Sequence, residues 1–355
     1  MVEPAVVACI QAPSQFIDDA RKADRVIKKN IKRHLRLLDM LPEGATPIGH
    51  FPQIVVYPEF SLQGLPSEKW SVEGWKRWLN KVAVPIPGDV TDAFAKKSVE
   101  HGCYQQVCIW ESSDEFPGHA FESVFITDPK GKVPYVRRRL ANILELSVTS
   151  TAEIYTEYMK KYGPNSGDAF FPVLDTPYGC LGGIMCCEMS TPEICRGLML
   201  NGTEILLHST SETDGGYMDG MSSRDWERRV RARDNCCYLV STNIGKIIDC
   251  NYPEDRDRGR SEIIDFMGRT LYRREFPGEG MILGTIDVAQ LRKNRRSGWA
   301  LTSHGQVFSD VCAAMYKEPL WPENERYFTT KGVGETKRKL FANLTKRRIL
   351  RDPGK

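Results

Sequence analysis

Short apolar runs alternate with longer amphipathic stretches along almost the whole chain. Most of the short runs are too brief for helices and rich in β-branched residues, so they predict strands. These strands are Ala5–Ile10, Ile54–Tyr57, Gln106–Trp110, Val124–Thr127, Cys180–Met185, Ile205–His208, Tyr238–Thr242 and Met281–Ile286. The amphipathic stretches predict helices over Ile17–Met40, Val90–His101, Ala152–Lys161, Pro192–Asn201 and Ser222–Asn235. This alternation is typical of α/β proteins, in which helices cover the faces of a sheet.

Neither an internal repeat nor a low-complexity linker divides the 355 residues. Hydrophobic residues make up 41% of the chain and charged residues 27%, the balance of a globular protein with a large core. We therefore expect one domain of about 300 residues followed by a C-terminal extension.

The net charge of +3 conceals an uneven distribution of charge. Residues 331–355 contain nine Lys and Arg side chains against Glu335 and Asp352, which leaves the rest of the chain mildly acidic. A mildly acidic body does not favour a nucleic-acid-binding protein. A basic tail is more typical of a solvated segment or one that docks on a partner.

The cysteines and histidines favour a reducing compartment and no metal site. The eleven cysteines form no CxxC motif and include two adjacent pairs, a pattern of reduced thiols in a cytosolic protein. The six histidines lack zinc-ligand spacing, so we expect no metal and no cofactor. The N-terminus does not resemble a signal peptide, and no 18-residue apolar run predicts a membrane span. We predict a cytoplasmic protein.

Cys186 occupies a position suited to a nucleophile. The predicted strand ends at Met185, and Thr191 followed by Pro192 is a strong signal for the start of a helix. Cys186 therefore lies on a tight strand-to-helix turn, where backbone N–H groups lower the pKa of a thiol and bind a developing oxyanion. A buried thiol without function is the plain alternative.

Glu59 follows another predicted strand in the segment VVYPEFSLQG. Both Glu59 and Cys186 thus come directly after strand ends, where open α/β sheets bind ligands. A carboxylate that faces a thiol can act as a general base and later return the proton to a leaving amine. An acid at the start of a helix is the alternative explanation for Glu59.

Several segments in order resemble the nitrilase superfamily of carbon–nitrogen hydrolases. They are ACIQAP, PEFSLQG, GKVPYVRRRL, CCEMSTPE, GTEIL, RARDNCCYLVSTN, SEIIDFMGRTL and IDVAQLR, and they cover roughly residues 5–295. The resemblance implies an α-β-β-α four-layer sandwich with a carbon–nitrogen hydrolase domain over residues 1–296. The extension over residues 297–355 would then be an inter-subunit arm of a homo-oligomer, a dimer or larger.

By this resemblance Cys186 is the nucleophile and Glu59 the general base. Arg139 stands where the family has its catalytic lysine, which is thought to stabilise the tetrahedral intermediate. A guanidinium can supply that charge through a planar fork of donors, but it cannot donate a proton as an acid. Glu122 stands where the family commonly has asparagine, a change that the sequence does not explain.

Other candidate residues surround these three. The family often has a second glutamate before the nucleophile, and Glu157 is the candidate for it, with Glu153 one turn earlier as a rival. His208 ends the strand after the nucleophile helix and is a candidate substrate contact. If Glu157 is the catalytic glutamate, Glu153 is, like His208, a candidate substrate contact.

The sequence thus predicts hydrolysis of a small carboxamide with release of ammonia, because PEFSLQG resembles aliphatic amidases and formamidases. The alternatives are an N-carbamoyl amino acid hydrolase, favoured by the 47-residue spacing of Arg139 and Cys186, and a nitrilase. A catalytically impaired homologue that acts as a scaffold is the non-enzymatic alternative, since Arg139 replaces the expected lysine.

Overall fold

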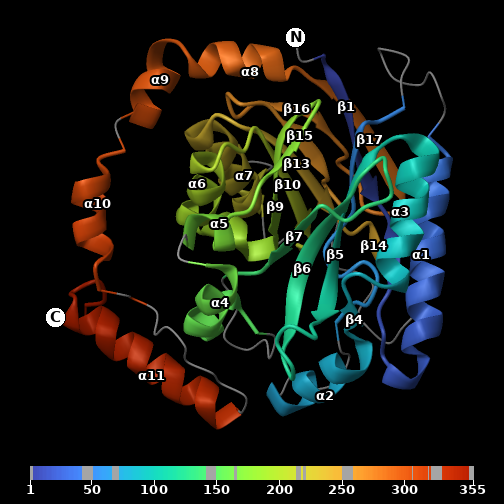
Figure 1. The fold of residues 1–355 in the computed structure, drawn as a ribbon, viewed down its shortest axis with the longest axis horizontal. Coiled ribbons are helices and arrows are strands. Elements are labelled where there is room, and N and C mark those ends of the chain that lie inside the picture. The colour runs from blue at the N-terminus through green and yellow to red at the C-terminus, as the bar shows by residue number, and fades with distance from the viewer. Residues whose placement is uncertain are drawn as a thin grey trace.

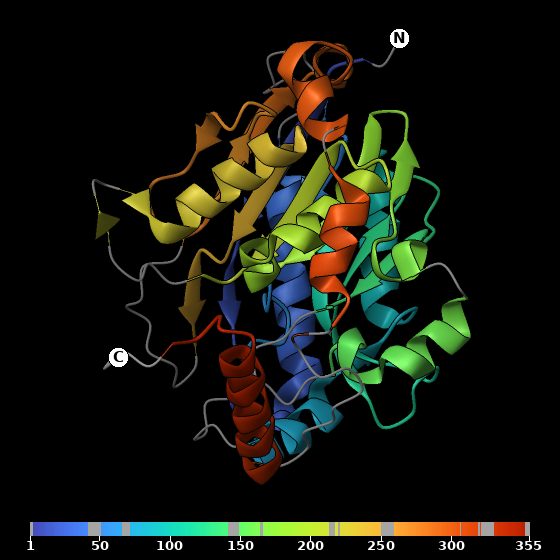
Figure 2. The ribbon, with the colours of Figure 1, turned by 90° about the vertical axis from the view of Figure 1, so that its left-hand side faces the viewer.

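The structure, a computed structural model, is arranged in two β-sheets that face each other between layers of helices (Figures 1 and 2). It describes residues 3–41, 51–65, 72–140, 149–163, 166–212, 217–218, 221–249, 259–305, 307–318, 320 and 330–351. None of the described helices is both long and apolar enough to cross a membrane.

The first sheet joins the N-terminal half of the chain to one later strand. Its order is β17 (Gly280–Ile286), β1 (Ala5–Gln11), β3 (Ile54–Val56), β5 (Tyr104–Ser112), β6 (Ala120–Thr127) and β7 (Tyr135–Arg138), with β4 (Val84–Pro85) pairing β5. The central strands β1, β3 and β5 are parallel, while β17, β6 and β7 run antiparallel to their neighbours. Parallel strands end at the same edge, which matters for the site described below.

The second sheet is built from the C-terminal half. Its order is β16 (Thr270–Arg273), β15 (Glu262–Ile264), β13 (Tyr238–Asn243), β10 (Ile205–Thr210), β9 (Gly179–Met185) and β8 (Leu174–Thr176). Strands β9, β10 and β13 are parallel. Two smaller pairings join β2 (Pro13–Gln15) to β14 (Lys246–Ile248) and β11 (Tyr217–Met218) to β12 (Met221–Ser222).

Each helical layer covers the outer face of one sheet. Helices α1 (Ala23–Asp39), α2 (Val72–Val82) and α3 (Asp89–His101) pack on the first sheet, and α6 (Pro192–Leu200) and α7 (Ser223–Asn235) pack on the second. On β1, Val7 and Cys9 point toward the other sheet while Ala8 and Ile10 point toward the helices, the two-residue alternation of a strand buried on both faces. The predicted α-β-β-α sandwich is confirmed.

Glycine brings the two sheets close together beside the site. A Cβ atom on Gly183 of β9 would lie 2.5 Å from Oε1 of Gln106 and 2.9 Å from a methyl of Val124, both on the first sheet. Gln106 in turn donates to the backbone oxygen of Leu207 on β10, at 3.0 Å. Only glycine allows this approach, so the sheets are held at a short fixed spacing.

The remaining helices lie at the sheet edge and in the C-terminal extension. They are α4 (Tyr155–Tyr162), α5 (Ser166–Phe170), α8 (Val288–Arg295), α9 (Gly298–Gly305), α10 (Ser309–Tyr316) and α11 (Thr330–Lys346). In Figure 1, α9, α10 and α11 run along the left margin, outside the sheets. Residues 321–329 and 352–355 of the extension lie outside the described residues.

All eight predicted strands and all five predicted helices are present, with shifted ends. The first predicted helix starts late, because residues Ala20–Lys22 form a 3-10 turn before α1. The sequence did not predict strands β7, β15 and β16 or helix α2.

Candidate active site

Strand ends from both sheets deliver the expected residues to one place. Glu59 follows β3 and Arg139 follows β7 in the first sheet, whereas Cys186 follows β9 in the second. The loop that carries Glu59 is tied to the second sheet, since its backbone N–H donates to the oxygen of Thr210 at 3.3 Å. The hydroxyl of Ser209 also donates to the oxygen of Tyr57 at 2.7 Å. These bonds fix the carboxylate relative to the nucleophile strand.

Cys186 lies in a tight turn, as its flanking sequence predicts. Strand β9 ends at Met185, residues Cys186–Ser190 form a 3-10 turn, and α6 begins at Pro192. The backbone of Cys186 has φ 46°, the left-handed region that residues other than glycine rarely adopt. Such a conformation persists where surrounding contacts enforce it, and it occurs often at functional sites.

His208 supplies one of those contacts. Its Nε2 lies 3.1 Å from the backbone oxygen of Cys186, and its Nδ1 lies 2.9 Å from the hydroxyl of Ser241. Burial lowers the pKa of His208 to about 3, so the ring is neutral. A carbonyl only accepts, so Nε2 carries the hydrogen and Nδ1 accepts from Ser241. Both nitrogens are thus engaged by the protein, and the ring contacts the backbone of the nucleophile where a substrate contact was expected.

Glu188 anchors the other side of the turn. Its carboxylate accepts from Arg137 at 2.6 and 2.9 Å and from the backbone N–H of Leu140 at 2.9 Å and of Met185 at 3.3 Å. It therefore links the end of β7 to the end of β9. This buried pair fixes Arg139 and Cys186 relative to each other across the two sheets.

Arg139 is fully buried and its guanidinium spans several anionic groups. Nη1 donates to Glu122 and lies 3.6 Å from Oε1 of Glu59, while Nη2 donates to Sγ of Cys187 at 2.6 Å. Burial opposes the charge of the guanidinium, but Glu122, the two thiols and Glu59 outweigh it and raise the pKa of Arg139. The site thus contains a permanent cation.

Glu59 is a buried carboxylate whose pKa is raised. Neither of its oxygens has a hydrogen-bond partner among the described residues. Burial, and then the Glu122 carboxylate, raise the pKa of Glu59 well above its ordinary value, although Arg139 and the Cys186 thiol act in the opposite direction. A raised pKa makes this carboxylate a stronger base, as general acid–base catalysis requires.

The two adjacent thiols have opposite pKa shifts. Their mutual hydrogen bond, followed by burial and by Glu59, raises the pKa of Cys186. The same hydrogen bond, together with Arg139 and against the effect of burial, lowers the pKa of Cys187 to about 6. Cys186 therefore keeps its proton in the resting site, while the sulfur beside the guanidinium carries the negative charge. Nothing in the sequence indicates this contact of Cys187 with Arg139.

The two glutamates expected between Arg139 and Cys186 lie elsewhere. Glu157 is on the exposed face of α4, and the carboxylate of Glu153 caps the preceding turn by accepting from the backbone N–H of Ser150 at 2.9 Å. Both make further contacts, and neither is among the groups that most affect the pKa of Cys186. The second carboxylate beside Arg139 is Glu122 on β6. The only signal for it in the sequence is an acid where the resemblance leads one to expect asparagine.

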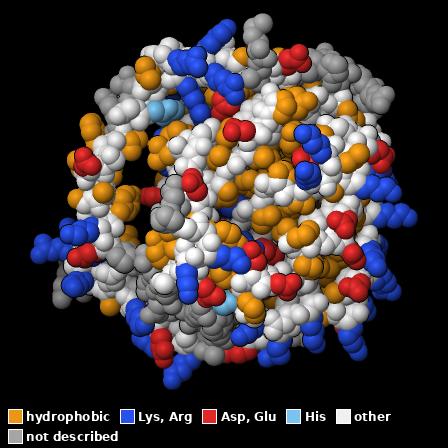
Figure 3. Space-filling model, viewed as in Figure 1, with side chains coloured by type: hydrophobic (Ala, Val, Ile, Leu, Met, Phe, Trp, Pro, Cys, Tyr) orange, Lys and Arg blue, Asp and Glu red, His pale blue; other side chains and the backbone are white. Residues whose placement is uncertain are grey.

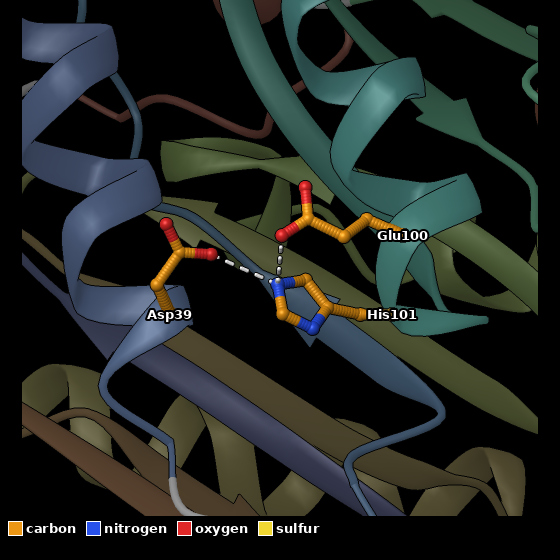
Figure 4. A group of neighbouring side chains, drawn as sticks. All are labelled: Asp39, Glu100 and His101. Carbon is orange, nitrogen blue, oxygen red and sulfur yellow. Dashed lines mark hydrogen bonds and ion pairs between the residues drawn. The ribbon is translucent and has the colours of Figure 1, made fainter.

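One cluster of described residues has the donor types of a metal site, and it lies far from Cys186. Asp39, Glu100 and His101 meet where α1 and α3 end (Figure 4). The ammonium of Lys97 already binds both carboxylates, at 2.7 Å to Asp39 and 2.9 Å to Glu100. The cluster precedes β5, at the strand end opposite to the one that carries the catalytic groups. It is a surface ion-pair network.

Comparison with known protein families gives one match over most of the chain. The model of the carbon-nitrogen hydrolase family matches residues 6–296. Formamidases of Bacillus cereus and Bacillus anthracis are similar, each with 26% identity over 312 residues, which cover 86% of this chain and 81% of theirs.

Solved structures share the fold at low sequence identity. Nit3 of Saccharomyces cerevisiae, described as a member of the nitrilase superfamily, aligns with a TM-score of 0.61 and 16% identity, over 83% of this chain and 94% of that one. XC1258 of Xanthomonas campestris, a CN-hydrolase superfamily protein, aligns with a TM-score of 0.58 and 13% identity over the same shares. These likenesses concern the arrangement of the chain.

Proposed function

Because the chain belongs to the carbon–nitrogen hydrolase family, and is thus a hydrolase of non-peptide carbon–nitrogen bonds, we propose that it hydrolyses a small carboxamide through a thioester on Cys186. The observation that carries this proposal is the meeting of a strained thiol, a buried guanidinium and a buried carboxylate that lacks a hydrogen-bond partner among the described residues. The similarity to formamidases favours a small amide.

In the first half of the reaction, Glu59 takes the proton of the Cys186 thiol as the sulfur adds to the amide carbon. Arg139 and backbone N–H groups at the turn stabilise the negative charge that develops on the amide oxygen. Glu59 then gives its proton to the amide nitrogen. The carbon–nitrogen bond breaks, ammonia leaves, and the acyl group remains on Cys186.

In the second half, water replaces ammonia. Glu59 accepts a proton from water as its oxygen adds to the thioester carbon, and it returns that proton to the sulfur as the carbon–sulfur bond breaks. The products are a carboxylic acid and the original thiol. His208 and Glu188 act by positioning Cys186 and take no part in proton transfer.

The decisive experiment compares the wild-type protein with Cys186→Ala. Ammonia release is measured over simple amides, N-carbamoyl amino acids and nitriles, and we expect amide turnover that disappears in Cys186→Ala while circular dichroism is unchanged. Activity that persists in this variant would rule out the mechanism. Release of carbon dioxide together with ammonia would identify an N-carbamoyl amino acid hydrolase, and nitrile turnover without amide turnover a nitrilase.

Arg139 decides between an enzyme and an impaired homologue that acts as a scaffold. Its contacts with Glu122 and Cys187 use the planar fork of the guanidinium, which the compact ammonium of lysine does not reproduce. We expect Arg139→Lys to reduce kcat. A wild-type protein without turnover on any of the three substrate classes would favour the scaffold.

We further propose that residues 297–355 form an arm that contacts a second copy of the chain. Apolar side chains on and next to α10 are exposed, namely Phe308 (67%), Val311 (64%) and Met315 (64%). Figure 3 shows hydrophobic side chains on this side and an opening between α10 and the body. Exposed apolar surface of this kind marks an interaction site. Assembly in a reducing cytoplasm would suit both the arm and the free cysteines.

Sedimentation of full-length variants tests the arm. Val311→Asp together with Met315→Asp should shift the protein to a smaller assembly, because a charge in an apolar interface is costly. Val99→Asp on α3 is the matched control, since Val99 is also exposed (54%) but lies outside the arm. An unchanged assembly size in the α10 variant would contradict the proposal.

A further inference from the structure

Among the described residues, Glu122 is the one carboxylate beside the proposed catalytic groups to which the mechanism above gives no role. It lies on β6, between β5 and the edge strand β7, fully buried and opposite Trp110 of β5. Its own backbone oxygen accepts from the N–H of Arg139 at 2.9 Å, and its side chain accepts from Nη1 of the same residue. Main chain and side chain of one residue thus both hold Arg139.

Within the described part of the chain, the charged and titratable groups around Glu122 come from both sheets. They are Glu59 after β3, Cys108 on β5, Arg139 after β7 and Cys187 after β9, which is hydrogen-bonded to Cys186. Cys108 donates to Oε1 of Glu122 at 3.5 Å, and burial raises its pKa, so it stays neutral. The group therefore contains two carboxylates and one guanidinium beside the two adjacent thiols.

Two buried carboxylates beside one cation favour retention of a proton. Like charges at close range raise the proton affinity of the group, because ionising both is costly. Glu122 is bonded directly to the guanidinium, whereas Oε1 of Glu59 stands 3.6 Å from it and has no hydrogen-bond partner among the described residues. Glu59 therefore has the higher proton affinity of the two carboxylates, and it is the one that takes up the proton leaving Cys186.

We propose that Glu122 is a positioning residue that engages Arg139 and thereby keeps Glu59 available to receive the proton of Cys186. Without this carboxylate, Nη1 of Arg139 would turn to Glu59 and shorten their 3.6 Å ion pair to a hydrogen bond. Such a pair would stabilise ionised Glu59 and weaken it as a base. The inference deepens the proposed function, because it rests on Cys186 as the nucleophile and Glu59 as the base.

The fork of the guanidinium explains why an arginine suits this arrangement. Its two terminal nitrogens reach Glu122 and Cys187 in different directions, at the same time and in one plane. An ammonium on a flexible stem has no such fixed pair of directions. Arg139 and Glu122 therefore form one unit, and replacing either alone removes the hydrogen-bonded ion pair between them.

The test uses the rate at which iodoacetamide alkylates Cys186, followed by mass spectrometry across a pH series, in parallel with kcat/KM for amide hydrolysis. We compare wild type with Glu122→Gln, which removes the charge and preserves the shape. The matched control is Glu111→Gln on β5, because Glu111 is also buried and bonded to an arginine of the same triplet, Arg138.

In Glu122→Gln the acid limb of the alkylation profile should move at least about one pH unit lower, because the like charge that raises the pKa of Glu59 is gone. The plateau rate should fall roughly tenfold, since the proton rests less often on Glu59. In Glu111→Gln the profile should coincide with that of wild type. Glu122→Asp, which withdraws the charge by one methylene, should move the limb in the same direction by less, and it serves as the test if Glu122→Gln does not fold.

A Glu122→Gln profile that coincides with wild type would overturn the inference and leave Glu122 a structural residue. The proposed function fails separately, through hydrolysis that survives Cys186→Ala. Loss of hydrolysis in Cys186→Ala with an unshifted Glu122→Gln profile would thus remove only the role of Glu122.

Discussion

Two neighbouring arginines at the end of β7 lead into two different ion clusters. Arg138 points outward and donates to both oxygens of Glu111 at 3.0–3.1 Å, to Glu115 at 3.0 Å and to the hydroxyl of Tyr162 at 2.7 Å. Arg139 points inward to Glu122, Glu59 and Cys187. Both clusters contain a buried cation with two carboxylates, yet they differ in how fully their oxygens are bonded.

In the outer cluster, both oxygens of Glu111 have hydrogen-bond partners. Glu111 also accepts from the hydroxyl of Ser123 at 2.5 Å, and Arg138 lies over the rings of Phe116 and Phe121, 5.4 and 5.1 Å from their centroids. A cavity of about 750 Å³ opens beside it, but the nucleophile is not among its lining residues. In the inner cluster Glu59 has no such partner among the described residues. Incomplete bonding, more than burial or charge, distinguishes the reactive cluster from the structural one.

The largest expected effect is a loss of activity when Glu59 of the inner cluster is replaced. Glu59→Gln should reduce kcat/KM by about 10²–10⁴-fold, because it removes the base that takes the proton of Cys186. The free energy of unfolding should stay the same or rise, since a poorly satisfied buried charge disappears. Steady-state kinetics and urea unfolding measure the two quantities. A variant with reduced stability and nearly normal kcat/KM would reverse the assignment.

Arg138→Met should give the opposite pattern. Removing the cation leaves Glu111 buried without its partner, which costs about 3–5 kcal/mol in the free energy of unfolding. The kcat at a permissive temperature should stay close to wild type. Arg21→Met is the control, because Arg21 pairs with Asp19 on the surface with 88% of its side chain exposed. Equal stability losses in these two variants would count against a buried structural role for Arg138.

Cys187→Ser should change the reactivity of Cys186 in the inner cluster. The hydrogen bond with Cys187 is the main cause of the raised pKa of Cys186, so a serine, which stays neutral, should lower that pKa. A decrease of about one unit gives roughly tenfold faster alkylation of Cys186 by iodoacetamide near pH 7. Peptide mass spectrometry locates the label, and Cys312→Ser on α10 is the control. A slower reaction at Cys186 would show that Cys187 assists ionisation.

The smallest effect concerns the exposed network of Asp39, Glu100 and His101. Burial acts to raise the pKa of Asp39, but hydrogen bonds from Lys97 and His101 outweigh it and lower that pKa. This group therefore adds stability above its unfolded pKa of about 3.9, and the contribution disappears as the pH falls through the lower folded value. Asp39→Asn should cost less than about 1 kcal/mol at pH 7 and nothing near pH 2. A larger loss, or stabilisation of wild type by added Zn²⁺, would contradict a mere surface network.

The sequence predicted most of the sandwich because its central strands are continuous apolar runs. The sequence did not predict strand β7, because its Arg137 and Arg138 are charged. The partners that permit their burial, Glu188 and Glu111, are distant in the sequence. The outer strands β15 and β16 are short, and their mixed pattern does not alternate clearly. Local patterns do not reveal side chains that are buried by pairing.

The candidate site was predictable only where a strand end marked it. Glu59 and Cys186 each follow an apolar run and could be found in this way. Glu122 lies inside such a run, AFESVFIT, where nothing local distinguishes a functional acid from an irregular strand position. Glu157 and Glu153 were proposed from their spacing, but spacing along the chain does not determine which face of a helix turns toward a sheet.

The proposed base and nucleophile belong to different halves of the chain. Gly183, which has no side chain, allows the close contact that sets the separation between these halves. A methyl group inserted there would wedge the halves apart and widen the gap between carboxylate and sulfur while leaving each half intact. Proton transfer declines steeply with distance. Turnover should therefore report the spacing of the halves more sensitively than any optical probe of folding.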